Sequence, residues 1–191
     1  MHPSIQFQLL AGAVTADAPN LLASAELTKL KPFRARFKLG KQTAMDGNLP
    51  EHWSVPAPDE FTSGEIFHDQ DNVQGSKAFG LQKSEGPSPI QFRCDGIQLL
   101  ADKPYALTFN YLTAGGSGAA RLMVDRLQHD KTHSIERALT DTGGSWKSVA
   151  VTITPRRDAL FELQLHCYAV GVEKAIYFSS LSLALATPST K

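Results

Sequence analysis

The second half of the chain alternates between apolar and polar residues over several short segments, and no other feature constrains the fold as strongly. From Tyr105 to Tyr111 every second residue is tyrosine, leucine or phenylalanine, and the residues between them are small or polar. The segments 146–154 and 161–168 repeat this alternation. A period of two is typical of a β-strand whose two faces meet different surroundings. The sequence therefore predicts an all-β protein.

Turn-forming residues, such as Asp95-Gly and Asp141-Thr-Gly-Gly, separate further segments of the same kind. No segment longer than ten residues shows the periodicity of a helix. Many short strands between such turns are typical of a β-sandwich or barrel. The expected strands are 5–10, 20–27, 31–40, 64–68, 77–83, 89–94, 97–99, 104–112, 119–128, 134–140, 146–154, 160–169 and 174–185.

Composition narrows the possible partners. The chain has 191 residues, and its 19 Lys and Arg balance its 19 Asp and Glu, so no net charge draws it to nucleic acid or an anionic membrane. No apolar run is long enough for a membrane helix, and the first residues lack the basic leader of a clear signal peptide. Cys94 and Cys167 are either two buried thiols or one disulfide across the core.

Six short motifs occur in a characteristic order. They are Asn20-Leu-Leu, Leu49-Pro-Glu-His-Trp53, Gly75-Ser-Lys-Ala-Phe-Gly-Leu81, Lys103-Pro-Tyr-Ala-Leu-Thr-Phe109, Trp146-Lys147 and Tyr177-Phe-Ser-Ser-Leu-Ser-Leu183. In this order they resemble the jelly-roll carbohydrate-binding modules of families four, nine and twenty-two. The resemblance implies a two-sheet antiparallel β-sandwich of jelly-roll, galactose-binding-domain-like topology over 20–186. Residues 1–19 would be an N-terminal extension or linker, and 187–191 a C-terminal tail.

The resemblance also implies a structural calcium ion, held in part by an early glutamate, for which Glu26 is the nearest candidate. The family usually has paired aspartates in the closing strand, whereas this chain has Ser179 and Ser180. Calcium prefers six to eight oxygen ligands that include carboxylates, and two serines do not supply that charge. Asp71 and Asn72 are the alternative side-chain ligands.

The candidate binding residues follow from the alternation. In a jelly roll the alternate polar residues of one sheet line a concave outer face. A sugar can stack there on an aromatic ring while polar groups form hydrogen bonds with its hydroxyls. Tyr168 is the expected stacking residue, and His166 lies beside it on the same face. Phe67 and His68 suggest a second sugar site at the rim of the sandwich. The full expected ligand-binding set is Arg93, Asn110, Arg121, Asp125, Gln164, His166 and Tyr168.

The predicted function is non-catalytic binding of a polysaccharide or oligosaccharide, in an extracellular or periplasmic protein that carries a linked catalytic domain. One alternative is a jelly-roll polysaccharide lyase or glycoside hydrolase that uses His166 and Tyr168. The other is an interaction or spacer domain of a larger protein. One architecture hosts many functions, so the fold alone does not separate these three.

Overall fold

The computed structural model describes residues 18–22, 27, 29–73, 76–115, 117–124, 134–171 and 173–186. Within these ranges the chain forms strands and no helix, as the alternation predicts. The strands are β1 (Arg34–Lys38), β2 (Lys41–Asp46), β3 (Trp53–Ser54), β4 (Ser63–Val73), β5 (Ser76–Glu85), β6 (Ile90–Leu99), β7 (Tyr105–Thr113), β8 (Gly118–Val124), β9 (Ser134–Leu139), β10 (Lys147–Ile153), β11 (Ala159–Cys167) and β12 (Ala175–Leu185).

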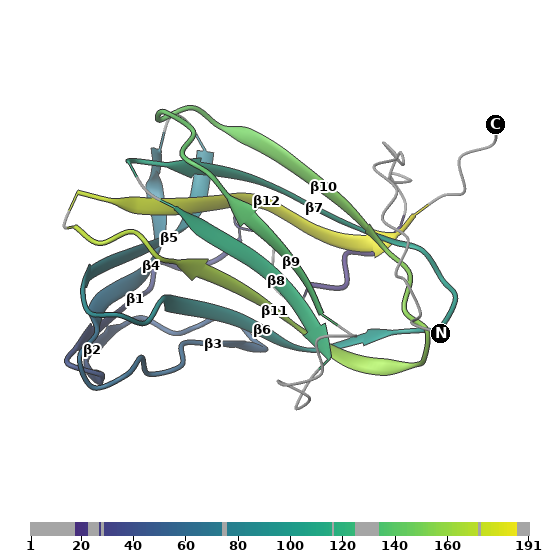
Figure 1. Ribbon diagram of the computed structural model, residues 1–191, viewed down its shortest axis with the longest axis horizontal. Coiled ribbons are helices and arrows are strands. Elements are labelled where there is room, and N and C mark those ends of the chain that lie inside the picture. The colour runs from purple at the N-terminus through teal and green to yellow at the C-terminus, as the bar shows by residue number, and fades with distance from the viewer. Residues whose placement is uncertain are drawn as a thin grey trace.

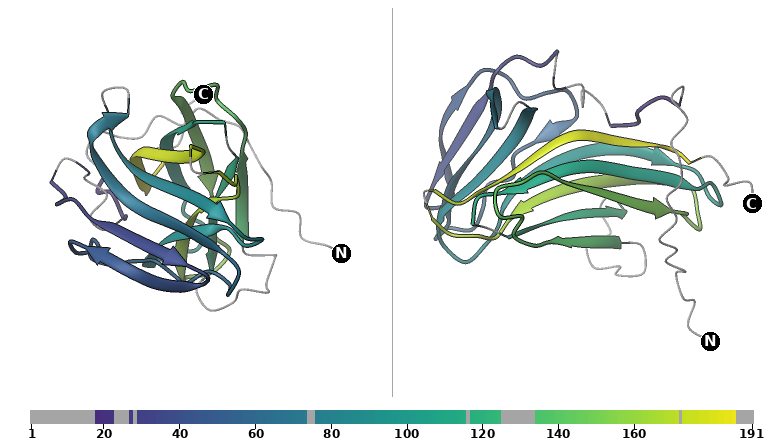
Figure 2. Two further views of the ribbon diagram at one scale, coloured as in Figure 1. Left: turned by 90° about the vertical axis from the view of Figure 1, so that its left-hand side faces the viewer. Right: turned by 90° about the horizontal axis from the view of Figure 1, so that it is seen from above.

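The described strands form two antiparallel sheets that pack face to face. The seven-stranded sheet has the order β10-β7-β12-β5-β4-β1-β2, and the five-stranded sheet has the order β3-β6-β11-β8-β9. In Figure 1 the five-stranded sheet crosses the picture with β9 uppermost and β3 lowest. Figure 2 shows that the seven-stranded sheet curls, since β1, β2, β4 and β5 stand at a steep angle to β7 and β12. This two-layer arrangement confirms the predicted β-sandwich.

The core lies between the sheets and contains the apolar residues on the inward face of each strand. Phe161, Leu163, Leu165 and Cys167 of β11 all face it, with at most 5% of each exposed. Trp53, on the two-residue edge strand β3, stacks on Phe92 with ring centroids 4.4 Å apart and is 5% exposed. Trp53 therefore covers the core at the β3 edge of the five-stranded sheet.

Asp95-Gly96 is a β-bulge rather than the turn expected from the sequence. Ile90–Leu99 is one strand, and its pairing with β11 shifts register between Phe161 and Leu163. Gly96 has φ +72°, a conformation that favours glycine, so the strand kinks and continues instead of reversing. The two segments predicted at 89–94 and 97–99 are therefore halves of β6.

Asn20 closes an open edge of β12. β5 pairs with β12 only through Phe178, and beyond that point the Asn20 amide takes its place. Its Nδ2 donates to the carbonyl of Leu181 at 3.0 Å, and its Oδ1 accepts from the N–H of Leu183 at 3.0 Å. The N–H of Leu21 also donates to the carbonyl of Leu183 at 2.8 Å, so the Asn20-Leu-Leu motif binds the sheet through the Asn20 side chain and the Leu21 backbone. The rest of the first predicted strand, 23–26, lies outside the described residues, as does 5–10.

Candidate functional site

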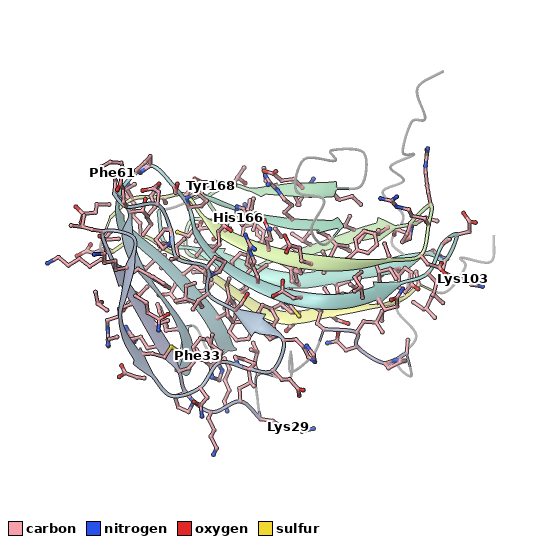
Figure 3. All side chains as sticks on the ribbon, turned by 90° about the horizontal axis from the view of Figure 1, so that it is seen from below. Lys29, Phe33, Phe61, Lys103, His166 and Tyr168 are labelled. Carbon is pink, nitrogen blue, oxygen red and sulfur yellow. The ribbon has the colours of Figure 1, made fainter. Side chains whose placement is uncertain are left out.

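β11 is the middle strand of the five-stranded sheet, and both of its faces are buried. Its outward row is Glu162, Gln164 and His166, which are only 3%, 4% and 3% exposed. Polar residues on an outer sheet face are ordinarily solvated, so neighbouring groups cover this row, which forms the buried floor of the face. Figure 3 shows His166 and Tyr168 side by side near one end of the molecule.

The floor residues are joined by hydrogen bonds along the strand. Tyr168 Oη lies 3.0 Å from His166 Nδ1, and His166 Nε2 lies 3.0 Å from Gln164 Oε1. Gln164 Nε2 in turn donates to Glu162 Oε1. Residues two apart on a strand point the same way, which is why the alternating sequence builds this chain of contacts. We call Glu162, Gln164, His166 and Tyr168 the polar row.

Two arginines flank the polar row, one on each neighbouring strand. Arg93 of β6 and Arg121 of β8 both lie opposite Gln164 in register. Arg121 donates to Glu136 of β9 through both Nε and Nη2. Arg93 Nη2 donates to Gln91 at 3.3 Å, its Nη1 is 3.9 Å from Glu162 Oε2, and its buried Nε has no hydrogen-bond partner.

The electrostatics keep the rings of the polar row neutral. Burial is the main cause that lowers the pKa of His166 from 6.5 to about 4; Arg121 and Arg93 lower it further, and Glu136 opposes them. Burial also raises the pKa of Tyr168, with Glu136 acting in the same direction. Neutral pH therefore leaves an uncharged imidazole and an uncharged phenol on this face.

Tyr168 provides the accessible aromatic surface. It follows the last residue of β11 and is half-buried, and its N–H donates to the carbonyl of Ser117 at 3.0 Å. Its ring meets that of His166 edge to face, with centroids 5.7 Å apart and an interplanar angle of 62°. Gln91, opposite His166 on β6, adds a half-buried amide to the same face.

The structure brings five of the expected ligand-binding residues together: Arg93, Arg121, Gln164, His166 and Tyr168. Asn110 does not join them, because β7 belongs to the seven-stranded sheet, where Asn110 lies on the outer face and accepts from Ser148 at 2.7 Å. Alternation fixes which face of a strand a residue occupies but not to which sheet the strand belongs. Asp125 lies outside the described residues.

The expected second sugar site does not form as predicted. His68 points into the core, where it stacks on Phe33 with centroids 6.2 Å apart, while Phe67 points outward. The tip of the Phe67 ring packs against Gly80 of β5, and the Arg34 guanidinium carbon is 4.5 Å from the centroid of the ring. Only 8% of Phe67 is exposed, so it covers the sheet rather than offering a surface.

Metal binding stays a prediction. Glu26 lies outside the described residues, and so do the side chains of Asp71 and Asn72. Among the residues whose side chains are described, no three His, Cys, Asp or Glu gather as a metal site would require. Measuring the thermal midpoint with calcium and with a chelator tests the calcium ion directly.

Cys94 and Cys167 are not joined by a disulfide. Cys94 lies opposite Leu163 and Cys167 opposite Ile90, four residues apart along the paired strands β6 and β11. At about 3.3 Å per residue this separation is about 13 Å, and a disulfide needs Cα atoms within about 7 Å. The sequence left open a disulfide or two buried thiols, and the structure shows two buried thiols.

Sequence reasoning missed Glu136, which borders this face, and the exposed aromatic residue Phe61. Glu136 neutralises Arg121, yet it lies in β9, whose partner strand cannot be identified from alternation alone. Phe61 is 62% exposed and lies toward the same end of the molecule as Tyr168 in Figure 3. Its position in a proline-containing loop after Pro56 and Pro58 was the available signal for an exposed aromatic.

No protein-family model matches the sequence, and no curated protein matches it. Among solved structures, the CBM22-1 xylan-binding domain of Paenibacillus barcinonensis Xyn10C superposes with a TM-score of 0.50 at 10% identity, over 75% of this chain and 91% of that one. A cyclase from Fischerella sp. TAU, solved with 4-(1H-indol-3-yl)butan-2-one, gives 0.50 at 14% identity, over 75% and 89%. Tailspike protein 4 of bacteriophage CBA120 gives 0.54 at 16% identity, over 71% of this chain but 19% of its own.

These similarities concern the fold, since every identity is low and the neighbours differ in what their descriptions say they do. In the part of the chain that is described, nothing has the helical length and apolarity needed to cross a membrane. The two-sheet architecture and the structural neighbours together confirm that this chain resembles jelly-roll carbohydrate-binding modules in fold.

Proposed function

We propose that the chain is a non-catalytic carbohydrate-binding domain that holds a polysaccharide or oligosaccharide on the outer face of the five-stranded sheet. The observation that carries this proposal is the polar row, in which an accessible aromatic ring adjoins a buried, hydrogen-bonded floor. A sugar offers an apolar C–H face and a ring of hydroxyls, and it needs a flat ring together with fixed polar partners.

The flanking side chains suit the hydroxyls of a sugar. The half-buried Arg93 makes only a long 3.9 Å contact to Glu162 through Nη1, which leaves donor capacity on the exposed part of its guanidinium. Gln91 and Arg121 line opposite sides of the row at neighbouring rungs. Because the floor is already ordered by its own hydrogen bonds, little conformational entropy is lost when ligand binds.

The same geometry argues against catalysis by His166 and Tyr168. A general base at neutral pH works best with a pKa near that pH, whereas the pKa of His166 is about 4 and that of Tyr168 is raised. Both ring nitrogens of His166 already have partners within the row. The lyase or hydrolase alternative would require the row to rearrange when substrate binds.

Affinity electrophoresis in gels that contain a polysaccharide tests the proposal, with xylan as the first probe because one structural neighbour is described as xylan-binding. Wild-type protein is expected to be retarded by at least one polysaccharide in a panel. Tyr168→Ala is expected to weaken binding by about tenfold through loss of the stacking ring.

Tyr177→Ala is the matched control, because Tyr177 is a half-buried tyrosine on the outer face of the other sheet. It is expected to leave retardation unchanged. Loss of retardation in Tyr177→Ala but not in Tyr168→Ala would place the site on the seven-stranded sheet instead. Absence of retardation throughout the panel would favour the interaction or spacer function.

An enzyme would be revealed by its products. Incubation with the same polysaccharides is expected to release neither reducing ends nor unsaturated sugars and to leave polymer length unchanged. The proposal extends to the context of the domain: in an extracellular or periplasmic protein, such binding would raise the concentration of a linked catalytic domain near its glycan.

A further inference from the structure

The hydrogen bonds of the polar row connect its four side chains in sequence, from a buried end to a half-exposed end. Four side chains follow one another on the same face, and each contact joins one specific atom to another: Tyr168 Oη to His166 Nδ1, His166 Nε2 to Gln164 Oε1, and Gln164 Nε2 to Glu162 Oε1. One end is a buried carboxylate and the other is a half-exposed phenol. The chemistry at the buried end determines what the exposed end can offer.

The direction starts at Glu162. Glu162 Oε1 accepts from Gln164 Nε2, and its other oxygen, Oε2, lies 3.9 Å from Arg93 Nη1, so both carboxylate oxygens face donors. Gln164 must therefore turn its NH2 group toward Glu162, and its carbonyl oxygen then faces His166. The short contact between the two side chains has this orientation.

The orientation of Gln164 in turn selects the tautomer of His166. The Gln164 carbonyl accepts from Nε2, so the proton of the neutral ring is on Nε2 and Nδ1 carries a lone pair. Tyr168 then has one way to bond with Nδ1: its O–H donates inward. With its only proton committed, the phenolic oxygen presents lone pairs to the solvent side.

We propose that Glu162 is a positioning residue that fixes the polarity of the polar row, so that Tyr168 acts on a bound glycan as a hydrogen-bond acceptor and selects a sugar hydroxyl that donates. Glu162 is 3% exposed and reaches the exposed phenol only through Gln164 and His166. The ligand part of this inference rests on the proposed function, whereas the polarity of the row does not.

Another acid on the same face provides a matched comparison. Glu136 lies two strands from β11 and bonds to Arg121, and it is not a member of the chain of hydrogen bonds that joins Glu162 to Tyr168. Replacing either glutamate by glutamine exchanges one carboxyl group on this face for an amide of the same shape. Only Glu162→Gln removes the carboxylate that accepts from the NH2 group of Gln164 and so keeps that group turned away from His166.

The test is a long-range proton–nitrogen NMR correlation on protein labelled with nitrogen-15, which shows which ring nitrogen of His166 carries the proton. In the wild type we expect the proton on Nε2. In Glu162→Gln the new amide can meet Gln164 with either end, so we expect a second population with the proton on Nδ1. Glu136→Gln is expected to keep the wild-type spectrum of this ring.

Three results would overturn the inference: a proton on Nδ1 in the wild type, an unchanged tautomer in Glu162→Gln, or an equal change in Glu136→Gln. If Glu162→Gln fails to fold, Gln164→Met interrupts the row at its next member, and the tautomer is again expected to become mixed. The wild-type spectrum alone decides the first result, whatever the variants do.

Calorimetric titration with xylohexaose examines the ligand part. We expect affinity to fall by about three- to tenfold in Glu162→Gln relative to the wild type, since one directed hydrogen bond to the ligand is lost. Equal affinity in wild type and Glu162→Gln would overturn the selection of a donating hydroxyl. If no glycan binds while the tautomers behave as expected, the proposed function fails and the polarity of the row stands.

Discussion

The buried imidazole of His166 should make folding stability depend on pH in a definable window. Its pKa is about 4 in the folded chain, against an ordinary value of 6.5, and burial is the main cause. Between these two values the unfolded chain binds a proton that the folded chain excludes. The contribution of His166 to stability is therefore complete above about pH 6.5 and is lost as the pH falls toward 4.

The size of the effect follows from the same two values. A pKa difference of about 2.5 units corresponds to about 3 kcal/mol in full, of which about 2 kcal/mol is lost between about pH 7 and about pH 5. Urea unfolding followed by intrinsic fluorescence at the two pH values measures it. Asp59 and Asp141, whose pKa values are lowered by hydrogen bonds, lose their contributions only below about pH 3.8, outside this window.

His166→Asn is the control, because asparagine retains hydrogen-bonding atoms but does not titrate. The variant is expected to be less stable than wild type at about pH 7, with a loss on acidification smaller by about 2 kcal/mol. The same loss in both proteins would show that His166 is accessible to protons in the folded chain. The reasoning about a neutral, buried polar row would then be wrong.

Three further predictions concern the scaffold. Gly80→Ala should destabilise the fold by about 1–3 kcal/mol in urea unfolding, because a Cβ there would lie 2.4 Å from the Phe67 ring; a wild-type midpoint would contradict this packing. Asn20→Ala should cost about 1–3 kcal/mol by leaving β12 backbone groups without their partners, and Asn20→Asp, which keeps the acceptor, should cost less. Cys94 and Cys167 are fully buried, and burial raises the pKa of Cys167 to about 11. Both thiols should therefore react with Ellman's reagent only after unfolding, and fast reaction of the native protein would refute their burial.

The strands could be predicted because alternation is a local property. The residues that face the core in β7 and β11 are those whose parity the sequence assigned to the interior. The parity of Gln164, His166 and Tyr168 likewise placed them together on one outer face. What the period of two could not supply was the extent of strands such as β4 and β5, which continue past the expected ends into less regular sequence.

The pairing between strands could not be predicted from alternation within single segments of the sequence. Asn110 has the outward parity expected of it, yet β7 lies in the seven-stranded sheet, so Asn110 is separated from the polar row by the core. The pairing of Arg121 with Glu136 depends on β8 and β9 meeting in one particular register. Asp95-Gly96 is another such case, since the same two residues can serve a turn or a bulge and the partner strand decides between them.

The burial of β11 on both sides has a consequence for altering specificity. Glu162, Gln164 and His166 contribute to folding and line the face proposed for ligand, so any exchange among them risks the integrity of the whole scaffold. Gln91 and Arg121, on adjacent strands, and Tyr168, past the end of β11, are more accessible and less constrained by packing. Libraries intended to retarget this surface should randomise those peripheral positions and leave the central strand intact.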